Sequence, residues 1–325
     1  MSQTPGGRRR IGRAVVTGGA GFLGSHLCER LVRDGVQVVC VDNFLTGSSA
    51  NVTHLLGDAF SLVRADVSEG IAVDGPVDVV FHLASPASPP AYRRFAVETL
   101  MVGADGTRNA LDLAVRTDAV FVLASTSEVY GDPLEHPQRE TYRGNVDPIG
   151  PRSMYDEAKR FAEALAVAYA GAEGVPVRIA RIFNTCGPRL RGGDGRLVPS
   201  LATACLEGRP MTMHGDGSQT RSLAYVDDTV DALVRLATSE YDRPVNVGNP
   251  DERSVLDIAR LVAAAAGAEP RFAFVDRPEQ DPERRCPDIS TARRVLGWEP
   301  RTTVEQTIER SVEWLRGAAA EARAG

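Results

Sequence analysis

Short apolar runs rich in valine, isoleucine and phenylalanine alternate with longer amphipathic stretches over the first 183 residues. Such runs predict buried β-strands, whereas apolar positions that recur every three or four residues predict helices. The predicted strands are residues 14–17, 36–42, 62–65, 77–83, 120–124 and 177–182. The predicted helices are residues 21–34, 92–116 and 153–170. Strands that alternate with helices in this way run parallel, so we expect an α/β fold with a doubly wound, Rossmann-like sheet.

The pattern loosens after Asn184, where glycine and proline become frequent. Here it predicts helices over 227–239, 254–266, 290–296 and 304–316, and a short strand over 245–247. We therefore expect three parts: a flexible tail over 1–12, a sheet domain over 13–183 that also receives about 224–249, and a smaller discontinuous lobe from 184–223 and 250–325. The lobe is expected to pack over the carboxyl edge of the sheet.

The composition narrows the partners and the compartment. A net charge of −6 argues against nucleic acid or an anionic membrane surface as the main partner, and no run reaches the roughly 18 apolar residues of a membrane span. The five cysteines form no CxxC pair, and their odd number fits a reducing cytoplasm better than a disulfide framework. The five histidines show no ligand spacing, so no metal is expected.

A glycine-rich turn follows the first predicted strand and opens the first predicted helix. In the sequence TGGAGFLG, small residues let the backbone approach a pyrophosphate, which the N–H groups at a helix N-terminus can bind. A tight strand–helix turn without a ligand would show the same spacing. The candidate cofactor contacts in this turn are Gly18, Gly21, Phe22, Leu23 and Gly24.

The next two predicted strands end near acidic residues that suit a dinucleotide. Asp42 lies 18 residues after Gly24, close to the spacing expected of an acid that binds ribose. A carboxylate there would accept both ribose hydroxyls and repel a 2′-phosphate, which favours NAD over NADP. Asp66 and Val67 follow the third strand and could hold the adenine. Together with the glycine turn, these residues predict NAD as the cofactor.

Tyr155 and Lys159 lie four residues apart at the start of a predicted helix, so their side chains share one face. A phenol has a pKa near 10, which a neighbouring ammonium and a positive nicotinamide ring would lower. The phenolate could then take the hydroxyl proton of an alcohol while NAD accepts the hydride. Lys159 is the only lysine among 37 basic residues, which indicates a place where the wide, permanently charged arginine would not serve.

The sequence STSE, residues 125–128, ends the fifth predicted strand at the same edge of the sheet. A hydroxyl of this strip could bridge the substrate hydroxyl to Tyr155. Glu128 stands out because plain alcohol oxidation needs no further acid or base. The alternative for Glu128 is a surface carboxylate or a helix cap.

Several longer motifs resemble those of a known family. TGGAGFLGSHL, Tyr155-xxx-Lys159, STSEVYGDP and RIFNTCGPR are similar to the extended short-chain dehydrogenases that modify sugar nucleotides. DNFLTG, HLASPASPPAY, PIGPRSMYDEAKR, GDGSQTRS and VNVGNP resemble the UDP-glucuronate decarboxylases, also called UDP-xylose synthases. The resemblance runs from about Arg13 to Trp314.

This resemblance implies an NAD-dependent decarboxylation. Oxidation at C4 of the sugar would make the C6 carboxylate a β-keto acid that loses CO2, and NADH would then reduce C4 to give UDP-xylose. The resemblance assigns the C4 hydroxyl proton to Thr126 and Tyr155, with Lys159 holding the tyrosine and the nicotinamide ribose. Ser127 and Glu128 would assist protonation and positioning around C5 and the carboxylate.

The resemblance implies further contacts and an assembly. Asn184 would bind the substrate, Arg221 its diphosphate, and Arg285, rather than Arg284, would lie near it. Each arginine could instead be a solvated surface charge. A homodimer through the helices near 92–116 and 153–170 is also implied. The remaining implied cofactor contacts are Asn43, Leu83, Ser85, Ser125, Thr185 and Tyr155, which thus has a catalytic and a binding role.

Related reactions remain as alternatives. The 4,6-dehydratases carry Asp-Glu where this chain has Ser127-Glu128, and the 4-epimerases lack the acid, so the strip favours decarboxylation. A sugar-nucleotide 4-epimerase or 4,6-dehydratase is nevertheless the second hypothesis. A non-catalytic NAD-binding protein is the third.

The chain also departs from the family pattern. Met101-Val102-Gly103 stands where Lys-Thr-Asn is usual, Cys186 where an aromatic residue is usual, and Asp147 where asparagine is usual. A cation and two hydrogen-bonding side chains near the cofactor and sugar are thereby lost. We hypothesise that the closing reduction is impaired, so that some UDP-4-keto-pentose is released and NADH accumulates.

Overall fold

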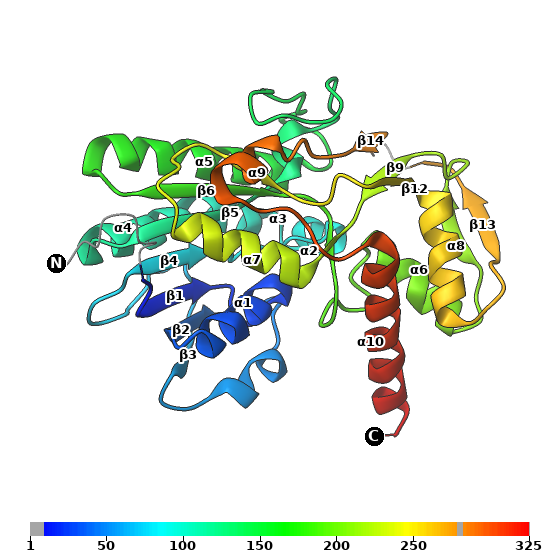
Figure 1. The fold of residues 1–325 in the computed structure, drawn as a ribbon, viewed down its shortest axis with the longest axis horizontal. Coiled ribbons are helices and arrows are strands. Elements are labelled where there is room, and N and C mark those ends of the chain that lie inside the picture. The colour runs from blue at the N-terminus through cyan, green and yellow to red at the C-terminus, as the bar shows by residue number, and fades with distance from the viewer. Residues whose placement is uncertain (1–9, 278–281, 325) are drawn as a thin grey trace.

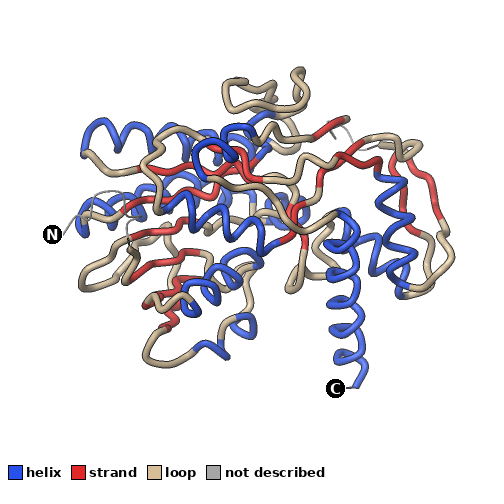
Figure 2. Tube along the Cα trace, in the orientation of Figure 1, coloured by secondary structure: helices blue, strands red, loops and turns tan. Residues whose placement is uncertain are grey.

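A seven-stranded parallel sheet forms the centre of the larger part of the computed structural model (Figures 1 and 2). The structure describes residues 10–277 and 282–324, so most of the expected tail lies outside the described residues. The strand order is β11-β6-β5-β4-β1-β2-β3, and all pairings are parallel. The doubly wound α/β fold is confirmed. The strands are β1 (Arg13–Thr17), β2 (Gln37–Asp42), β3 (Phe60–Arg64), β4 (Val79–His82), β5 (Val120–Thr126), β6 (Val177–Ile182) and β11 (Val245–Val247).

Neighbouring residues of each strand point to opposite faces of the sheet, and each face has its own core. Val16 and Phe81 pack beneath α1 (Phe22–Arg33), α7 (Val226–Ala237) and α9 (Ser290–Leu296). Val15 and Val80 pack on the other face, beneath α4 (Thr107–Thr117) and α5 (Ser153–Glu173). Because both faces are covered, the strands appear in the sequence as unbroken apolar runs.

The single helix predicted over 92–116 is wrong. The segment consists of α2 (Pro89–Arg94), α3 (Ala96–Met101), the π-helical turn η3 (Val102–Gly106) and α4. Gly103, in the π-helical turn, lies so close to α5 that a Cβ on it would come within 2.7 Å of the Ala158 Cβ. The break therefore accompanies a close helix–helix contact that the hydrophobic periodicity does not reveal.

A smaller lobe lies to one side of the sheet (Figure 1). Its helices α6 (Leu197–Leu206), α8 (Val255–Ala266) and α10 (Val304–Ala324) share a separate core that includes Met211, Ile258 and Ile308. Between the segments that build this lobe, the chain returns to the sheet through α7 and β11. Helix α6 was not predicted. The short strands, also not predicted, are β7 (Thr185–Cys186), β8 (Met211–His214), β9 (Thr220–Ser222), β10 (Ala224–Tyr225), β12 (Glu252–Ser254), β13 (Phe272–Val275) and β14 (Arg284–Arg285).

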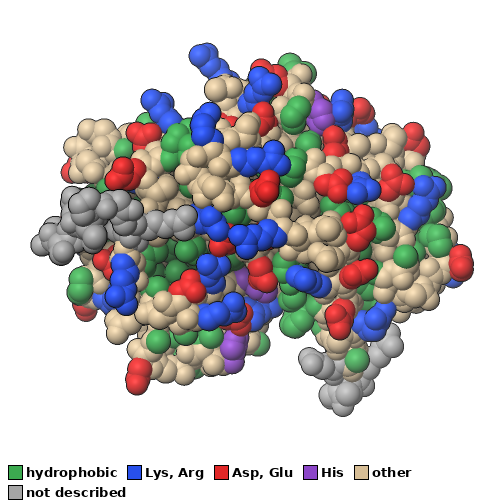
Figure 3. All heavy atoms as spheres, in the orientation of Figure 1, with side chains coloured by type: hydrophobic (Ala, Val, Ile, Leu, Met, Phe, Trp, Pro, Cys, Tyr) green, Lys and Arg blue, Asp and Glu red, His purple; other side chains and the backbone are tan. Residues whose placement is uncertain are grey.

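The remaining short elements are the 3-10 turns η1 (Ser49–Asn51), η2 (Thr53–Leu55) and η4 (Ser127–Tyr130). The surface mixes both signs of charge with scattered apolar side chains on the face in Figure 3. Among the described residues, no helix combines the length and apolarity that crossing a bilayer requires.

Candidate active site

A cavity of about 760 Å³ follows the carboxyl edge of the sheet and reaches into the lobe. It extends from the glycine turn after β1 to Arg285 on β14, and every candidate site residue named from the sequence lines it. Strand order reverses at β1 and β4, and ligands of doubly wound sheets bind where the strands on either side of such a point end. The structure therefore brings the candidate residues together around one cavity.

The glycine turn forms one end of this cavity. Gly18 has a φ of +67°, and a Cβ on it would lie 2.7 Å from the backbone nitrogen of Ala84. A Cβ on Gly24 would overlap the carbonyl oxygen of Gly18, so only glycine allows α1 to pack this closely on the turn. The N-cap of α1 is Gly21, which has no side chain to cap the helix. The helix N-terminus thus borders the cavity without a capping side chain, as a phosphate site requires.

The acids after β2 and β3 form the adjoining wall. Asp42 accepts hydrogen bonds from the Ala20 nitrogen (2.9 Å) and the Phe44 nitrogen (2.8 Å), which fix its carboxylate. Burial raises the pKa of Asp42, and these two bonds offset only part of that effect. Each oxygen keeps a lone pair that a ribose hydroxyl can use. Asn43 donates to Asp66 at 2.9 Å and so holds the next acid in place. These residues fit a dinucleotide.

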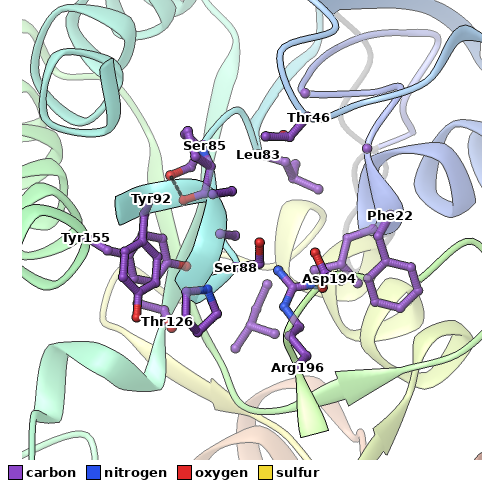
Figure 4. Close-up of a pocket in the computed structure, with 18 of the residues that line it drawn as sticks. Phe22, Thr46, Leu83, Ser85, Ser88, Tyr92, Thr126, Tyr155, Asp194 and Arg196 are labelled. Atoms are coloured by element: carbon purple, nitrogen blue, oxygen red, sulfur yellow. Dashed lines mark hydrogen bonds and ion pairs between the residues drawn. The ribbon is translucent and has the colours of Figure 1, made fainter. Parts of the chain in front are cut away.

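Tyr155 lies in the first turn of α5 with its ring stacked on that of Tyr92, at 5.3 Å between centroids and 10° between planes (Figure 4). Thr126, at the end of β5, lies beside Tyr155 in the same view, while Phe22 lies on the opposite side of the cavity. The amine of Lys159 is 6.0 Å from the Tyr155 ring centroid and donates to the Ala124 carbonyl at 2.9 Å. The predicted clustering of the pair with the end of β5 is therefore observed.

Burial dominates the ionisation of this pair. It raises the pKa of Tyr155 to about 12, and the hydrogen bond with Thr126 lowers that pKa by less. Burial also lowers the pKa of Lys159 to about 8. The expected lowering of the phenol pKa by the ammonium and a nicotinamide ring together stays a prediction. Formation of a phenolate depends on further positive charge, such as that of a nicotinamide ring.

Glu128 is held between two arginines. Arg152 donates to its Oε2 at 2.6 Å, and Arg285 donates to its Oε1. Burial would raise the pKa of Glu128, but Arg285 and Arg152 outweigh burial and bring that pKa well below its usual range. The side chain is therefore a carboxylate at neutral pH. The expected assistance of Glu128 in protonation and positioning around C5 stays a prediction.

Several expected contacts are engaged within the protein. The Ser125 hydroxyl donates to Glu163 at 2.6 Å, and the Thr185 hydroxyl donates to the Phe183 carbonyl at 3.1 Å. Arg285 is only 4% exposed inside the cavity, whereas Arg284 has an exposed side chain. In the part of the chain that the structure describes, the Asn184 Oδ1 atom is buried without a hydrogen-bond partner.

The positions that depart from the family pattern fall in different surroundings. Met101 and Val102 line the cavity, but Gly103 instead packs against Ala158. Cys186 also lines the cavity and joins the core of the lobe. Asp147 accepts a hydrogen bond from the Ile149 nitrogen in a surface loop.

Polar and aromatic residues of the cavity that the sequence did not single out include Arg152, Tyr92, Asp194 and Arg196. Arg152 precedes Tyr155 by three residues, and this helical spacing was a usable signal. Tyr92 is the last residue of the motif HLASPASPPAY, and nothing else in the sequence indicates that its ring lies at the site. Asp194 and Arg196 form an ion pair of 3.1 Å in the loop before α6, and both point into the cavity in Figure 4. A glycine-rich loop has no sequence pattern that predicts such an ion pair.

The comparisons with known proteins agree with this site. A model of the NAD dependent epimerase/dehydratase family matches residues 14–248. The chain belongs to this family. Among its relatives, UDP-glucuronic acid decarboxylase 1 from Xenopus tropicalis is 48% identical over 94% of this chain and 72% of its own. UDP-glucuronic acid decarboxylase 1 from Arabidopsis thaliana is 49% identical over 95% of this chain and 71% of its own. The resemblance to the UDP-glucuronate decarboxylases is confirmed.

Solved structures of epimerases share the fold. UDP-glucuronic acid 4-epimerase from Bacillus cereus, in complex with UDP-glucuronic acid and NAD, superposes with a TM-score of 0.82 at 27% identity, covering 94% of this chain and 99% of that one. UDP-glucose 4-epimerase from Thermotoga maritima, with UDP-glucose, gives 0.85 at 25% identity, covering 94% and 99%. This family thus uses one architecture for more than one sugar-nucleotide reaction, and the residues at the reacting end must distinguish them.

Proposed function

We propose that this protein is an NAD-dependent UDP-glucuronate decarboxylase that forms UDP-xylose and CO2. The observation that carries the proposal is a Glu128 carboxylate fixed by two arginines beside Tyr155 and Lys159. Oxidation and epimerisation at C4 need no such charged cluster next to the tyrosine. Relatives named UDP-glucuronic acid decarboxylase, matched over almost the whole chain, support the same substrate.

The chemistry divides between cofactor and chain. NAD, when bound, accepts the hydride from C4 and later returns it. Tyr155 takes the C4 hydroxyl proton, with Thr126 aligning the hydroxyl, and Lys159 stabilises the phenolate. The C4 ketone makes the substrate a β-keto acid, so the C5–C6 bond breaks, its electron pair moves toward the C4 oxygen, and CO2 leaves. A proton from solvent adds at C5, and Tyr155 returns its proton when C4 is reduced.

The charged cluster has a defined part in this sequence. Glu128, Arg152 and Arg285 together carry one more positive than negative charge. This surplus suits the C6 carboxylate in the bound substrate and the negative charge that develops on the sugar as CO2 departs. Glu128 orients both guanidinium groups, and Ser127 assists the positioning of the substrate around C5.

The two parts of the chain have separate tasks in this proposal. The sheet domain, 13–183 with about 224–249, holds NAD through the glycine turn and Asp42. The lobe, 184–223 and 250–325, holds the UDP end of the substrate, with Arg221 at the diphosphate and Asn184 nearby.

We also propose a homodimer that works in the cytoplasm. Helices α3 and α5 expose Val97 (67%), Phe161 (51%) and Val167 (58%), and exposed apolar side chains on neighbouring helices are typical of a subunit interface. Light scattering gives the molar mass in solution, which should be that of two chains. All five cysteines are free thiols, which fits a reducing compartment.

The departures at 101–103 motivate a finer proposal. Met101 and Val102 put apolar side chains on the cavity where the family has a cation and a hydroxyl. With fewer polar contacts to the cofactor and sugar, some UDP-4-keto-pentose leaves before C4 is reduced, and NADH accumulates. NADH absorbance and mass spectrometry of products measure this directly. Complete conversion to UDP-xylose with no 4-keto product would exclude it.

Product analysis with UDP-glucuronate and NAD tests the main proposal. Loss of CO2 from the sugar supports decarboxylation. Formation of a C4 epimer that keeps its carboxylate would identify an epimerase instead.

A further inference from the structure

We propose that Glu163 is a positioning residue for the catalytic lysine: it anchors the end of β5 and keeps the Lys159 amine positively charged. The inference rests on the proposed function, since it assigns Lys159 a part in C4 oxidation. Glu163 does not line the cavity that holds the other candidate residues, and no sequence motif singles it out.

The geometry joins Glu163 to the same strand end as Lys159. The two residues are four apart on α5, so they lie on one face of the helix. The Lys159 amine donates to the Ala124 carbonyl at 2.9 Å, and the Ser125 hydroxyl donates to Glu163 Oε1 at 2.6 Å. Both side chains therefore hold consecutive residues of β5, directly before Thr126. Substitution of Glu163 would therefore loosen the end of β5 next to Thr126, which lies beside Tyr155.

A bidentate ion pair fixes the carboxylate of Glu163. Arg181 donates from Nε to Oε1 at 2.9 Å and from Nη2 to Oε2 at 2.7 Å, and the side chains are only 12% and 13% exposed. Arg181 is itself held, because it also donates to the Tyr130 hydroxyl and the Glu140 carbonyl, each at 3.0 Å. Paired in this way, the carboxylate of Glu163 is held in one position by Arg181.

The charges around Lys159 show what this carboxylate does. The lysine is 5% exposed, and burial lowers its pKa to about 8, whereas Glu163 acts in the opposite direction. Tyr155, on the same helix, is a neutral phenol. His82, which faces the lysine from β4, is also neutral, because burial lowers its pKa to about 3. Among the described residues, Glu163 is thus the anion that favours the charged form of the amine.

This charge has a consequence for catalysis. A neutral amine could not stabilise a phenolate on Tyr155, so activity is lost as the pH rises through the pKa of Lys159. Glu163 raises that pKa and extends the active range upward. Without the carboxylate, the high-pH limb of the activity profile moves to lower pH.

The chain offers a direct readout, because Lys159 is its only lysine. Protein produced with 13C,15N-labelled lysine gives one lysine signal, whose chemical shift against pH reports the pKa of Lys159 without substrate. In Glu163→Gln we expect the titration midpoint to fall by about one unit. The matched control is Glu157→Gln, which removes a half-exposed carboxylate from the same helix and leaves the midpoint unchanged.

A second variant covers the case in which Glu163→Gln does not fold. Arg181→Gln removes the cation that offsets Glu163, so the midpoint should rise rather than fall. Opposite shifts in the two variants support the inference, as does a rise in Arg181→Gln when Glu163→Gln does not fold. An unchanged midpoint in either folded variant overturns it. A shifted midpoint in a protein that does not decarboxylate UDP-glucuronate would refute the proposed function and leave this role of Glu163 intact.

Discussion

The two ends of the cavity are built in different ways. The cofactor end takes its walls from the segments after β1, β2 and β3, within residues 17–67, and relies on backbone turns and two acids, Asp42 and Asp66. The reacting end gathers side chains from η4, α5 and β14, and its contact between Glu128 and Arg285 joins residues 157 apart in sequence. Local turn chemistry therefore determines the first end, while tertiary charge pairing determines the second.

The largest expected effect lies at the reacting end. Tyr155→Phe removes the proton acceptor and keeps the ring stacked on Tyr92, so decarboxylation should fall by roughly 10²–10⁴-fold. NAD binding, measured by calorimetry, should change little, because the glycine turn and Asp42 are untouched and the phenylalanine ring keeps the place of the tyrosine ring. Retained turnover would show that another group moves the C4 proton. Loss of NAD binding would show that the two ends are not independent.

The neighbouring arginines on β14 provide a matched pair of variants. Arg285→Met removes one of the two cations that hold Glu128, and kcat should fall by roughly 10²-fold. Arg284→Met removes an exposed charge next to it and should leave kcat near the wild-type value. Steady-state kinetics of UDP-xylose formation compares them. Equal losses in both variants would mean that the contact of Arg285 with Glu128 has no specific part in the reaction.

The cofactor end should respond with a smaller effect, confined to binding. Asp42→Ala removes a charged acceptor for ribose, and the Kd for NAD should rise by about 10–100-fold, since such a bond contributes about 1.5–3 kcal/mol. The ratio of the affinity for NAD to the affinity for NADP, measured in the same way, should also decrease. An unchanged ratio of the two affinities would place the ribose elsewhere.

The smallest expected effect is on stability, and it comes from the close packing of Gly103 against α5. Gly103→Ala should lower the free energy of unfolding by about 1–3 kcal/mol, because its Cβ would meet Ala158 on α5. The control, Gly171→Ala, adds a Cβ in open space on α5 and should stabilise the helix by up to about 1 kcal/mol. Urea denaturation measures both. An unchanged free energy of unfolding in Gly103→Ala would mean that α5 can shift to accept the Cβ without loss of stability.

Much of the fold could be predicted because both cores produce a strong signal. Strand faces that are buried on both sides gave unbroken apolar runs, so the central strands were located within a few residues. The break between α3 and α4 could not be predicted, since it depends on how closely Gly103 approaches another helix. The short strands of the lobe have too few residues to carry a periodic pattern.

In the candidate site too, features set by local sequence were predictable and features set by tertiary contacts were not. The glycine turn and Asp42 were identifiable because their chemistry requires certain residue types at a fixed local spacing. The ionised state of Glu128 was not, because it depends on Arg152 and Arg285, and a sequence rich in arginine does not show which ones meet a carboxylate. The contact of Ser125 with Glu163 was missed because it joins a strand to a helix 38 residues further along the chain.

Carbon-13 at C6 of UDP-glucuronate distinguishes the reactions open to this fold. Incubated with the protein and NAD, the labelled substrate should release ¹³CO2 and leave a UDP-pentose without label, whether or not C4 is fully reduced. Label retained in a UDP-hexuronate with inverted C4 would contradict the assignment of Glu128, Arg152 and Arg285 to decarboxylation. It would make the protein an epimerase with the same fold.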